Sequence, residues 1–326
     1  MDNMILRRLH ALFNSEVYHG WGKEKSYFEG WYYKLVSKDE QHIFAIIPGV
    51  AMDNKGSKQA FVQVLDGKTN KAHYIKYKFE EFMAQPNSFD VKIENNSFTL
   101  GSVELDSKII KGKVHMTENT PWSNEWYSPG IMGPFSFVPF MQCYHGILSM
   151  NHSLNGSLVY DGKEISFDGG KGYMEKDWGR SFPSGYIWMQ SNHFNSENVS
   201  LKSSVARIPW IGSSFTGYIA GVLIQDRIIE FTTYNNTKLR KCHVDKEKVE
   251  LVYENGKHLL EIEAIRSSTA SLASPIQGFM DGRINESMTS ILNIKLSDKK
   301  NDMILLEDSG RNAGLEVAGD LSTLLK

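Results

Sequence analysis

The chain has 326 residues, of which 41% are hydrophobic and 23% are charged, and its formal net charge is -2. This composition is typical of a globular protein with one large or two ordinary domains, and the near-neutral charge gives no electrostatic case for nucleic-acid binding. No apolar run reaches the roughly 20 residues of a membrane-spanning helix, the first residues lack the apolar core of a signal peptide, and Cys143 and Cys242 form no CxxC pair. We therefore expect a cytoplasmic protein with reduced thiols.

Short segments rich in β-forming residues follow one another along the chain, at 42–50, 60–67, 157–167, 216–224 and 227–234. Asn-Gly and Asp-Gly pairs, which supply the positive φ angles of tight hairpins, begin at Asp66, Asn155, Asp161, Asp168, Asn255 and Asp281. Helical periodicity is scarce, and residues 77–85 and the C-terminal end are its main candidates. The sequence predicts an all-β chain of antiparallel strands with little helix, arranged as a sandwich or barrel.

Two segments that lie about half the chain apart share a short sequence pattern, which we call the echo. "EGWYYKLV" begins at Glu29 and "SGYIWMQS" begins at Ser184, and in each an aromatic residue follows a glycine. A second aromatic residue stands two positions later, which gives the pairs Trp31 and Tyr33, and Tyr186 and Trp188. Residues at i and i+2 of a strand share a face. The echo indicates a duplicated β-barrel with halves at 1–183 and 184–326.

The segment 119–146 is rich in prolines, glycines and aromatic residues. A disordered linker would be poorer in aromatic residues, so we expect an ordered connection. It would either cover the apolar mouth of a barrel or pack on the outside of the barrel, and both interpretations stay open.

The stretch "KGYMEKDWGR" (171–180) has the alternation of a strand. Tyr173, Glu175 and Asp177 would then share one face, and Lys176 and Trp178 the other. A solvated polar face explains this pattern, and so does a proton-handling site inside a barrel.

Several segments resemble the tocopherol cyclase family: "YHGWGKEKS" (18–26), "YFEGWYYKLV" (27–36), "FVPFMQCYHGILSMNHSLNGSLVY" (137–160), "GYMEKDWGRSFPSGYIWMQSNHF" (172–194) and "AGLEVAGD" (313–320). The resemblance implies two lipocalin-like antiparallel β-barrel halves. It also implies a reaction of intramolecular lyase or isomerase type, in which an alkene of a prenylated hydroquinone is protonated and the phenol oxygen closes onto the tertiary cation to give a chromanol. Neither a metal nor a redox cofactor is needed for this reaction.

Within this resemblance, Glu175 is our first choice of proton donor, because the hydratase relatives have an acidic residue two positions after a tyrosine, as Glu175 follows Tyr173. Burial and the nearby Asp177 would raise the pKa of Glu175. The alternative is that Glu175 pairs with a lysine at a strand end. Asp177 stands where the plant pattern has an amide, so it is either a second proton carrier or a turn residue. His145 would accept the phenol proton; as alternatives, His145 and His19 are ordinary hydrogen-bonded histidines.

The four echo aromatics, Trp31, Tyr33, Tyr186 and Trp188, are either core residues or the lining that stabilises the cation through their ring faces. Gln190 lies on the second echo strand and is a further candidate for substrate binding. Glu29 would anchor its strand through an arginine or lysine, with Arg180 as a candidate partner.

Other catalytic machinery is not indicated. The sequence has no GxGxxG after a strand, no GxxxxGK[ST], no GxSxG and no HExxH. Two rival functions remain: a lipocalin-like protein that only binds an isoprenoid or other apolar ligand, and a hydratase that adds water to an isoprenoid alkene. In each case the partner is a small apolar isoprenoid or prenylated aromatic ligand, and a transient membrane contact could collect it.

Overall fold

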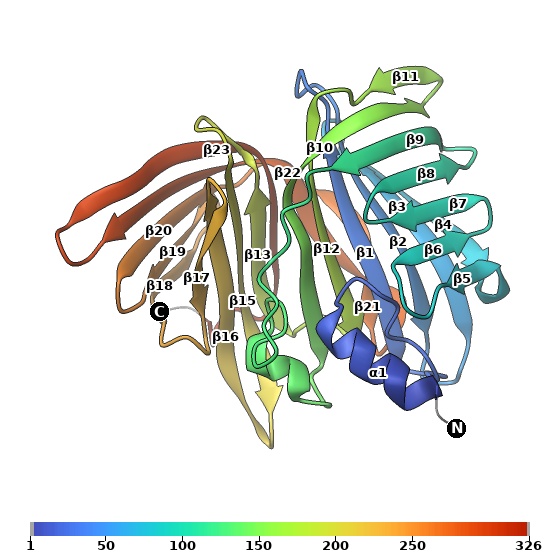
Figure 1. The fold of residues 1–326 in the computed structure, drawn as a ribbon, viewed down its shortest axis with the longest axis horizontal. Coiled ribbons are helices and arrows are strands. Elements are labelled where there is room, and N and C mark those ends of the chain that lie inside the picture. The colour runs from blue at the N-terminus through green and yellow to red at the C-terminus, as the bar shows by residue number, and fades with distance from the viewer. Residues whose placement is uncertain (1–2, 325–326) are drawn as a thin grey trace. The chain divides into compact units, whose positions relative to one another are not determined.

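The structure is a computed structural model that describes residues 3–324. The chain forms two compact units, shown as a ribbon in Figure 1. Unit 1 comprises Met1–Phe182 and Leu272–Arg283, and unit 2 comprises Pro183–Ser271 and Ile284–Lys326. The sequence predicted a division at residues 183/184 but gave no sign that Leu272–Arg283 would join the first unit.

The elements up to Phe182 are one α-helix, two 3-10 helices and twelve strands. They are α1 (Asn3–Phe13), β1 (Tyr27–Val36), β2 (Ile43–Met52), β3 (Lys58–Asp66), β4 (Lys71–Lys78), η1 (Phe79–Glu81), β5 (Phe82–Ala84), β6 (Asp90–Ile93), β7 (Asn96–Thr99), β8 (Ser102–Asp106), β9 (Ile110–Thr117), η2 (Gly133–Phe137), β10 (Cys143–Tyr160), β11 (Lys163–Ser166) and β12 (Gly170–Gly179).

The elements after Phe182 are all strands: β13 (Gly185–Ser191), β14 (His193–Phe194), β15 (Val199–Trp210), β16 (Ser213–Ile224), β17 (Arg227–Thr232), β18 (Lys238–Val244), β19 (Lys248–Glu254), β20 (His258–Ile265), β21 (Ala270–Ile276), β22 (Phe279–Asp298) and β23 (Met303–Gly319). The prediction of an all-β chain with little helix is confirmed.

The strands of the two sheets follow a similar order. The first runs β4-β3-β2-β1-β12-β10-β9-β8-β7-β6-β5, and the second runs β17-β16-β15-β13-β23-β22-β20-β19-β18. In the first sheet the echo strand β1 pairs with β12, and in the second sheet the echo strand β13 pairs with β23. Both β12 and β23 come from the end of their half of the chain. The echo therefore marks two strands that hold equivalent places in two similarly connected sheets.

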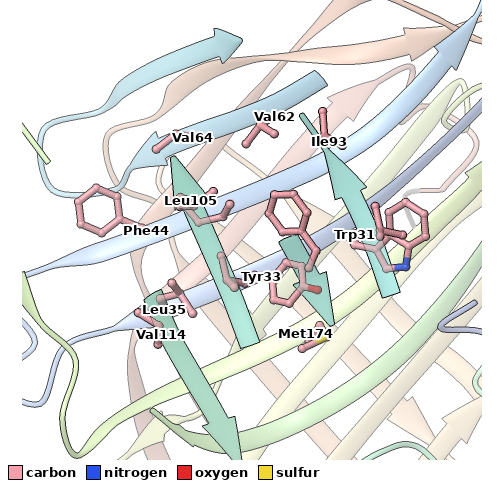
Figure 2. Packing of buried hydrophobic residues seen from close by; sticks show 14 of the residues in the cluster. Trp31, Tyr33, Leu35, Phe44, Val62, Val64, Ile93, Leu105, Val114 and Met174 are labelled. Carbon is pink, nitrogen blue, oxygen red and sulfur yellow. The ribbon is translucent and has the colours of Figure 1, made fainter. Parts of the chain in front are cut away.

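The sheets are open, which corrects the expectation of closed barrels. A barrel closes only when its end strands pair. Among residues 3–324, the end strands β4 and β5 of the first sheet do not pair with each other, and neither do β17 and β18 of the second. The first sheet instead curves around its core, where side chains of β1–β3 meet those of β6–β9, as Figure 2 shows for Trp31, Val62, Ile93 and Leu105.

The echo pairs face different ways. Trp31 and Tyr33 belong to the core of unit 1. In unit 2 the core residues on β13 are Ile187 and Met189, which alternate with Tyr186 and Trp188. A shift of one residue moves every side chain of a strand to the other face. The aromatic pairs are therefore not equivalent, although their strands are.

The turn pairs and helix candidates had mixed outcomes. Asp66, Asp161, Asp168 and Asn255 begin turns between consecutive strands, as expected, whereas Asn155 and Asp281 lie inside long strands. The predicted helix at 77–85 is wrong, because only the single turn η1 interrupts two strands there. The described C-terminal residues are likewise β23 and a turn, and the helix that does form, α1, was not predicted.

The segment 119–146 follows β9 and runs into the first residues of β10, all within unit 1. Trp122, Ile131 and Met141 bury their side chains, while Trp126 and Tyr127 are exposed. The segment is thus ordered by a few buried anchors and leaves other aromatic residues in solvent.

Candidate active site

The strand β12 carries the candidate acid between two neighbours. It pairs with β1 on one side and with β10 on the other, both antiparallel. Met174 points into the core of unit 1, so the alternation of the strand turns Tyr173, Glu175 and Asp177 to the opposite face. His145 of β10 is the register partner of Asp177 and therefore shares that face. The pairing brings together four candidates that the sequence had named.

These four residues, Tyr173, Glu175, Asp177 and His145, form a connected group that we call the acid cluster. The Tyr173 hydroxyl donates to Glu175 Oε2 at 2.5 Å. His145 Nδ1 lies 2.7 Å from Asp177 Oδ1, and His145 Nε2 lies 3.5 Å from Glu175 Oε2. Glu175 is only 4% exposed. A buried carboxyl group is thus held between a phenol and an imidazole.

The hydrogen bonds define the protonation of the outer members of the acid cluster. Burial raises the pKa of Tyr173 well above its usual value, so the phenol stays protonated and donates to Glu175. Because Asp177 can only accept when ionised, we assign the ring proton of His145 to Nδ1. The lone pair of Nε2 then faces Glu175, and Nε2 has no hydrogen-bond partner among the described residues.

The β10 strand bends beside the acid cluster. Its pairing with β12 shifts register between Ile147 and Ser149 and again between Ser149 and His152. Such bulges re-aim side chains and are common next to active sites. Gly172 accommodates the bend, since a Cβ atom at this position would lie 2.1 Å from His152 Nε2.

Three residues near the acid cluster were missed by the sequence analysis. Tyr32 is the register partner of Glu175, and the fully buried Lys34 is the partner of Tyr173. Cys143 places its sulfur 3.9 Å from Asp177 Oδ1, and burial followed by the charge of Asp177 raises the pKa of this thiol well above its usual value. The β1–β12 register could have identified Tyr32 and Lys34, but nothing in the sequence fixes that register.

The opposite face of the same strands carries a second polar group, the ion-pair cluster of Glu29, Lys176, His19 and Tyr27. Lys176 Nζ lies 2.5 Å from Glu29 Oε1, and both side chains are fully buried. The His19 backbone N–H donates to both Glu29 oxygens, at 2.9 and 3.0 Å, and the Tyr27 hydroxyl donates at 2.5 Å. Glu29 does anchor its strand as expected, but its partner is Lys176 and not Arg180.

The charges of the ion-pair cluster follow from its contacts. Burial lowers the pKa of Lys176 to about 8, against the opposing effect of Glu29. Burial alone would raise the pKa of Glu29, but Lys176 and His19 together bring it below its ordinary value. Burial and the Lys176 charge lower the pKa of His19, whose Nδ1 accepts from Lys176 at 2.7 Å. A neutral histidine therefore bridges the lysine to the N-terminal segment, where Lys176 also donates to the Val17 carbonyl.

Trp31 and Tyr33 lie on the side of this ion-pair cluster and not beside Glu175. Trp31 stacks on Phe89 at 5.4 Å and donates to the Glu16 carbonyl, and Tyr33 donates to the Thr99 carbonyl. Trp178 also lies on this side, stacked against His19 at 4.2 Å. The structure therefore does not bring the first echo pair to the acid cluster.

The remaining candidates lie in unit 2. Tyr186 donates to Glu316 Oε2 at 2.7 Å, and Trp188 and Gln190 share its face of β13. All three are buried and point away from the core of unit 2. Their role in substrate binding stays a prediction.

Within residues 3–324, one group has the donors of a metal site: His145, Glu175 and Asp177, whose ligand atoms lie within 4.8 Å of one another. Both nitrogens of His145 already face carboxylates, at 2.7 and 3.5 Å. A metal ion bound by all three residues would have to replace these contacts. Without an ion, the three side chains already contact one another directly.

Comparison with known proteins identifies the family of the chain. Residues 116–319, which include β12 and the acid cluster, match the family model described as tocopherol cyclase-like. The chain belongs to the tocopherol cyclase-like family.

A curated member, the chloroplastic tocopherol cyclase of Zea mays, is 27% identical over 197 residues, which are 57% of this chain and 41% of that protein. The chain thus spans about two fifths of the length of this relative. Within residues 3–324, no helix combines the length and the hydropathy needed to span a bilayer. The cytoplasmic location stays a prediction.

Solved structures are similar over most of the chain. The crystal structure of CghA with Sch210972 covers 90% of this chain and 89% of its own at a TM-score of 0.56 and 9% identity. Kievitone hydratase from Nectria haematococca covers the same shares at a TM-score of 0.51 and 11% identity. At these identities the likeness shows the fold alone, and the predicted lipocalin-like architecture is confirmed.

Proposed function

We propose that the protein is an acid catalyst that closes the ring of a prenylated hydroquinone to a chromanol, with Glu175 as the proton donor. The observation that carries this proposal is the acid cluster: a buried carboxyl group lies between a phenol donor and an unpartnered imidazole nitrogen. Membership of the tocopherol cyclase-like family supports the reaction type.

Protonation of an alkene needs an acid that keeps its proton near neutral pH. As the proton donor, Glu175 has to carry its proton in the resting enzyme, and the burial of its side chain favours this neutral form. The Tyr173 hydroxyl donates to Oε2 of Glu175 and orients the carboxyl group that carries the proton. This proton is transferred to the less substituted carbon of the alkene and leaves a tertiary cation on its neighbour.

Ring closure then releases a proton that the acid cluster can recycle. The phenol oxygen attacks the tertiary cation, and the phenol proton passes to His145 Nε2, while Asp177 stabilises the imidazolium through Nδ1. His145 Nε2 lies 3.5 Å from Glu175 Oε2, so the same proton can return to Glu175. Substrate and product are isomers, the proton count closes, and no cofactor takes part.

The test is the incubation of the purified protein with a panel of prenylated hydroquinones, followed by mass spectrometry of the products. The wild type should give a chromanol of unchanged mass. Glu175→Gln keeps the size and polarity of the side chain but lacks the acidic proton, so turnover should fall by about 10² to 10⁴ while ligand binding persists. Wild-type turnover in this variant would exclude Glu175 as the donor.

The rival functions give different results in the same assay. A binding protein would retain the ligand in both forms without converting it. A hydratase would add the mass of one water, because water instead of the phenol would reach the cation. Chelation by EDTA should leave the rate unchanged, and a rate that is lost with EDTA and restored by one divalent metal would favour a metal at the acid cluster.

A further inference from the structure

The helix α1 turns apolar side chains toward solvent. Leu6 and Leu9 are 62% and 55% exposed, and their spacing of three residues puts them on one face. On the inner side, Ala11 is buried and Arg7 lies over the Trp21 ring at 4.7 Å. A surface helix normally buries its apolar stripe. The orientation of α1 therefore leaves Leu6 and Leu9 largely exposed on one face of the helix.

The segment before β10 adds aromatic side chains next to this face. Phe137 contacts the Phe13 ring at 6.3 Å, and the Asn124 side chain donates to the Phe13 carbonyl at 2.6 Å. Close to Asn124 in sequence, Trp126 and Tyr127 are 77% and 58% exposed and contact each other. Figure 1 shows α1 and this segment near the same ends of β1 and β12. Leu6, Leu9, Trp126, Tyr127 and Phe137 make up what we call the apolar surface.

Positive charge borders the apolar surface. α1 contains Arg7 and Arg8 and no acidic residue, and Arg8 is exposed. Lys23 is exposed and stands two positions after Trp21, whose ring Arg7 covers; burial, and then the charges of Arg8 and Arg180, lower the pKa of Lys23. Exposed leucines and arginine on a helix, with exposed tryptophan, tyrosine and lysine on other segments of unit 1, are residue types that bind at the interface of an anionic bilayer.

We propose that the apolar surface, with Arg8 and Lys23, docks unit 1 onto an anionic phospholipid bilayer. Leu6 and Leu9 enter the boundary between headgroups and acyl chains, Trp126 and Tyr127 lie at headgroup depth, and the basic groups face the lipid phosphates. The reason for docking rests on the proposed function, since a prenylated substrate dissolves in the bilayer; the binding itself does not depend on catalysis.

The test is flotation of the purified protein with vesicles of phosphatidylcholine alone or mixed with phosphatidylglycerol. The wild type should float with the mixed vesicles, and this binding should weaken as salt is added. Leu6→Glu combined with Leu9→Glu should lower the partition coefficient about tenfold or more, because two apolar side chains are lost and charge of the wrong sign is added. Arg8→Glu should lower it about tenfold for the mixed vesicles and leave the weak binding to neutral vesicles unchanged.

Val159→Glu is the matched control. Val159 is 41% exposed and lies near the other end of β10 from Cys143, so the same change from an apolar to an acidic side chain should leave vesicle binding unaltered. Melting temperatures of all variants should stay within a few degrees of the wild type. The proposal is overturned if the wild type ignores mixed vesicles, or if the double variant binds them as the wild type does.

Catalytic assays separate this proposal from the proposed function. The double variant should keep its turnover of substrate dispersed in detergent and lose turnover of substrate embedded in vesicles. Glu175→Gln should bind vesicles normally and be inactive in both assays. A double variant that changes the oligomeric mass in the absence of lipid would assign the apolar surface to contacts between copies of the chain and overturn the membrane proposal.

Discussion

Asp177 orients His145 in the acid cluster. Substitutions of Asp177 distinguish the effect of its hydrogen-bond acceptor from the effect of its negative charge. The amide oxygen of Asn can still accept from His145 Nδ1, so Asp177→Asn should lower kcat less than about tenfold. Asp177→Leu leaves a buried donor unpaired, which costs about 1–3 kcal/mol, or about 5- to 150-fold in kcat. Steady-state kinetics of both variants would measure this difference. A loss near 10⁴ in the Asn variant would show that the carboxylate charge itself is needed.

Part of the acid cluster follows from local sequence alone. The alternation of a strand suffices to place Tyr173, Glu175 and Asp177 on one face, and the structure has them there. His145 is 32 positions from Asp177 and meets it only through the bulged register of β10 against β12. This register cannot be predicted from the local sequence. The family resemblance singled out His145, whereas the spacing of residues alone could not have identified it.

The partner of Glu29 shows the same limit. A buried charge needs a counter-charge, but the sequence offers many cations, and Arg180 was the expected one. The β1–β12 register puts Lys176 next to Trp31, within reach of Glu29. A single residue of slip would have turned Lys176 to the other face.

At the scale of elements, the pairing of β1 with β12 depends on the buried ion pair of Glu29 and Lys176. Removal of one partner leaves an uncompensated buried charge, so Lys176→Met and Glu29→Gln should each lower the free energy of unfolding by about 3–5 kcal/mol. The double variant should lose less than the sum of the two, because no charge is left unpaired. Urea unfolding of the four proteins measures this coupling, and strict additivity would contradict it.

The pH dependence of the same experiment gives a control. The pKa of Glu29 is lower in the folded than in the unfolded chain, so its contribution to stability is present above the ordinary glutamate range and is lost as the pH falls through the folded value. The difference in stability between the wild type and Glu29→Gln should therefore shrink in acid. A difference that grows as the pH falls would give the opposite sign and refute the ionised pair.

The hairpin between β21 and β22 attaches to unit 1 through Gly278. Its φ is +92°, and a Cβ atom there would lie 2.1 Å from the Tyr27 backbone nitrogen. Gly278→Ala should destabilise the protein by about 1–3 kcal/mol, since strain adds to a clash with backbone. Gly256→Ala is the matched control, because no atom lies within 4 Å of its added Cβ. Thermal unfolding of both variants decides, and equal melting temperatures would contradict this role.

At the scale of the whole molecule, turn pairs and β-rich segments sufficed to predict the fold class, and the echo located two equivalent strands, β1 and β13. The offset between the echo pairs could not be predicted, because the sequence does not say which face of a strand is the core face when aromatic residues stand on both. The open sheets and the association of Leu272–Arg283 with unit 1 depend on pairings between distant residues. For instance, the Gln63 side chain exchanges two hydrogen bonds with the Ala273 backbone.

In the proposed reaction an alkene is protonated by an acid whose proton exchanges with solvent. The most direct test is to run the reaction of a prenylated hydroquinone in D2O and to analyse the product by mass spectrometry and NMR. We expect a chromanol with one deuterium bound to carbon, at the position next to the new C–O bond, and a rate of its formation that is lower by about 10² to 10⁴ in Glu175→Gln. A chromanol without carbon-bound deuterium, or the same labelled product from Glu175→Gln at the wild-type rate, would contradict it.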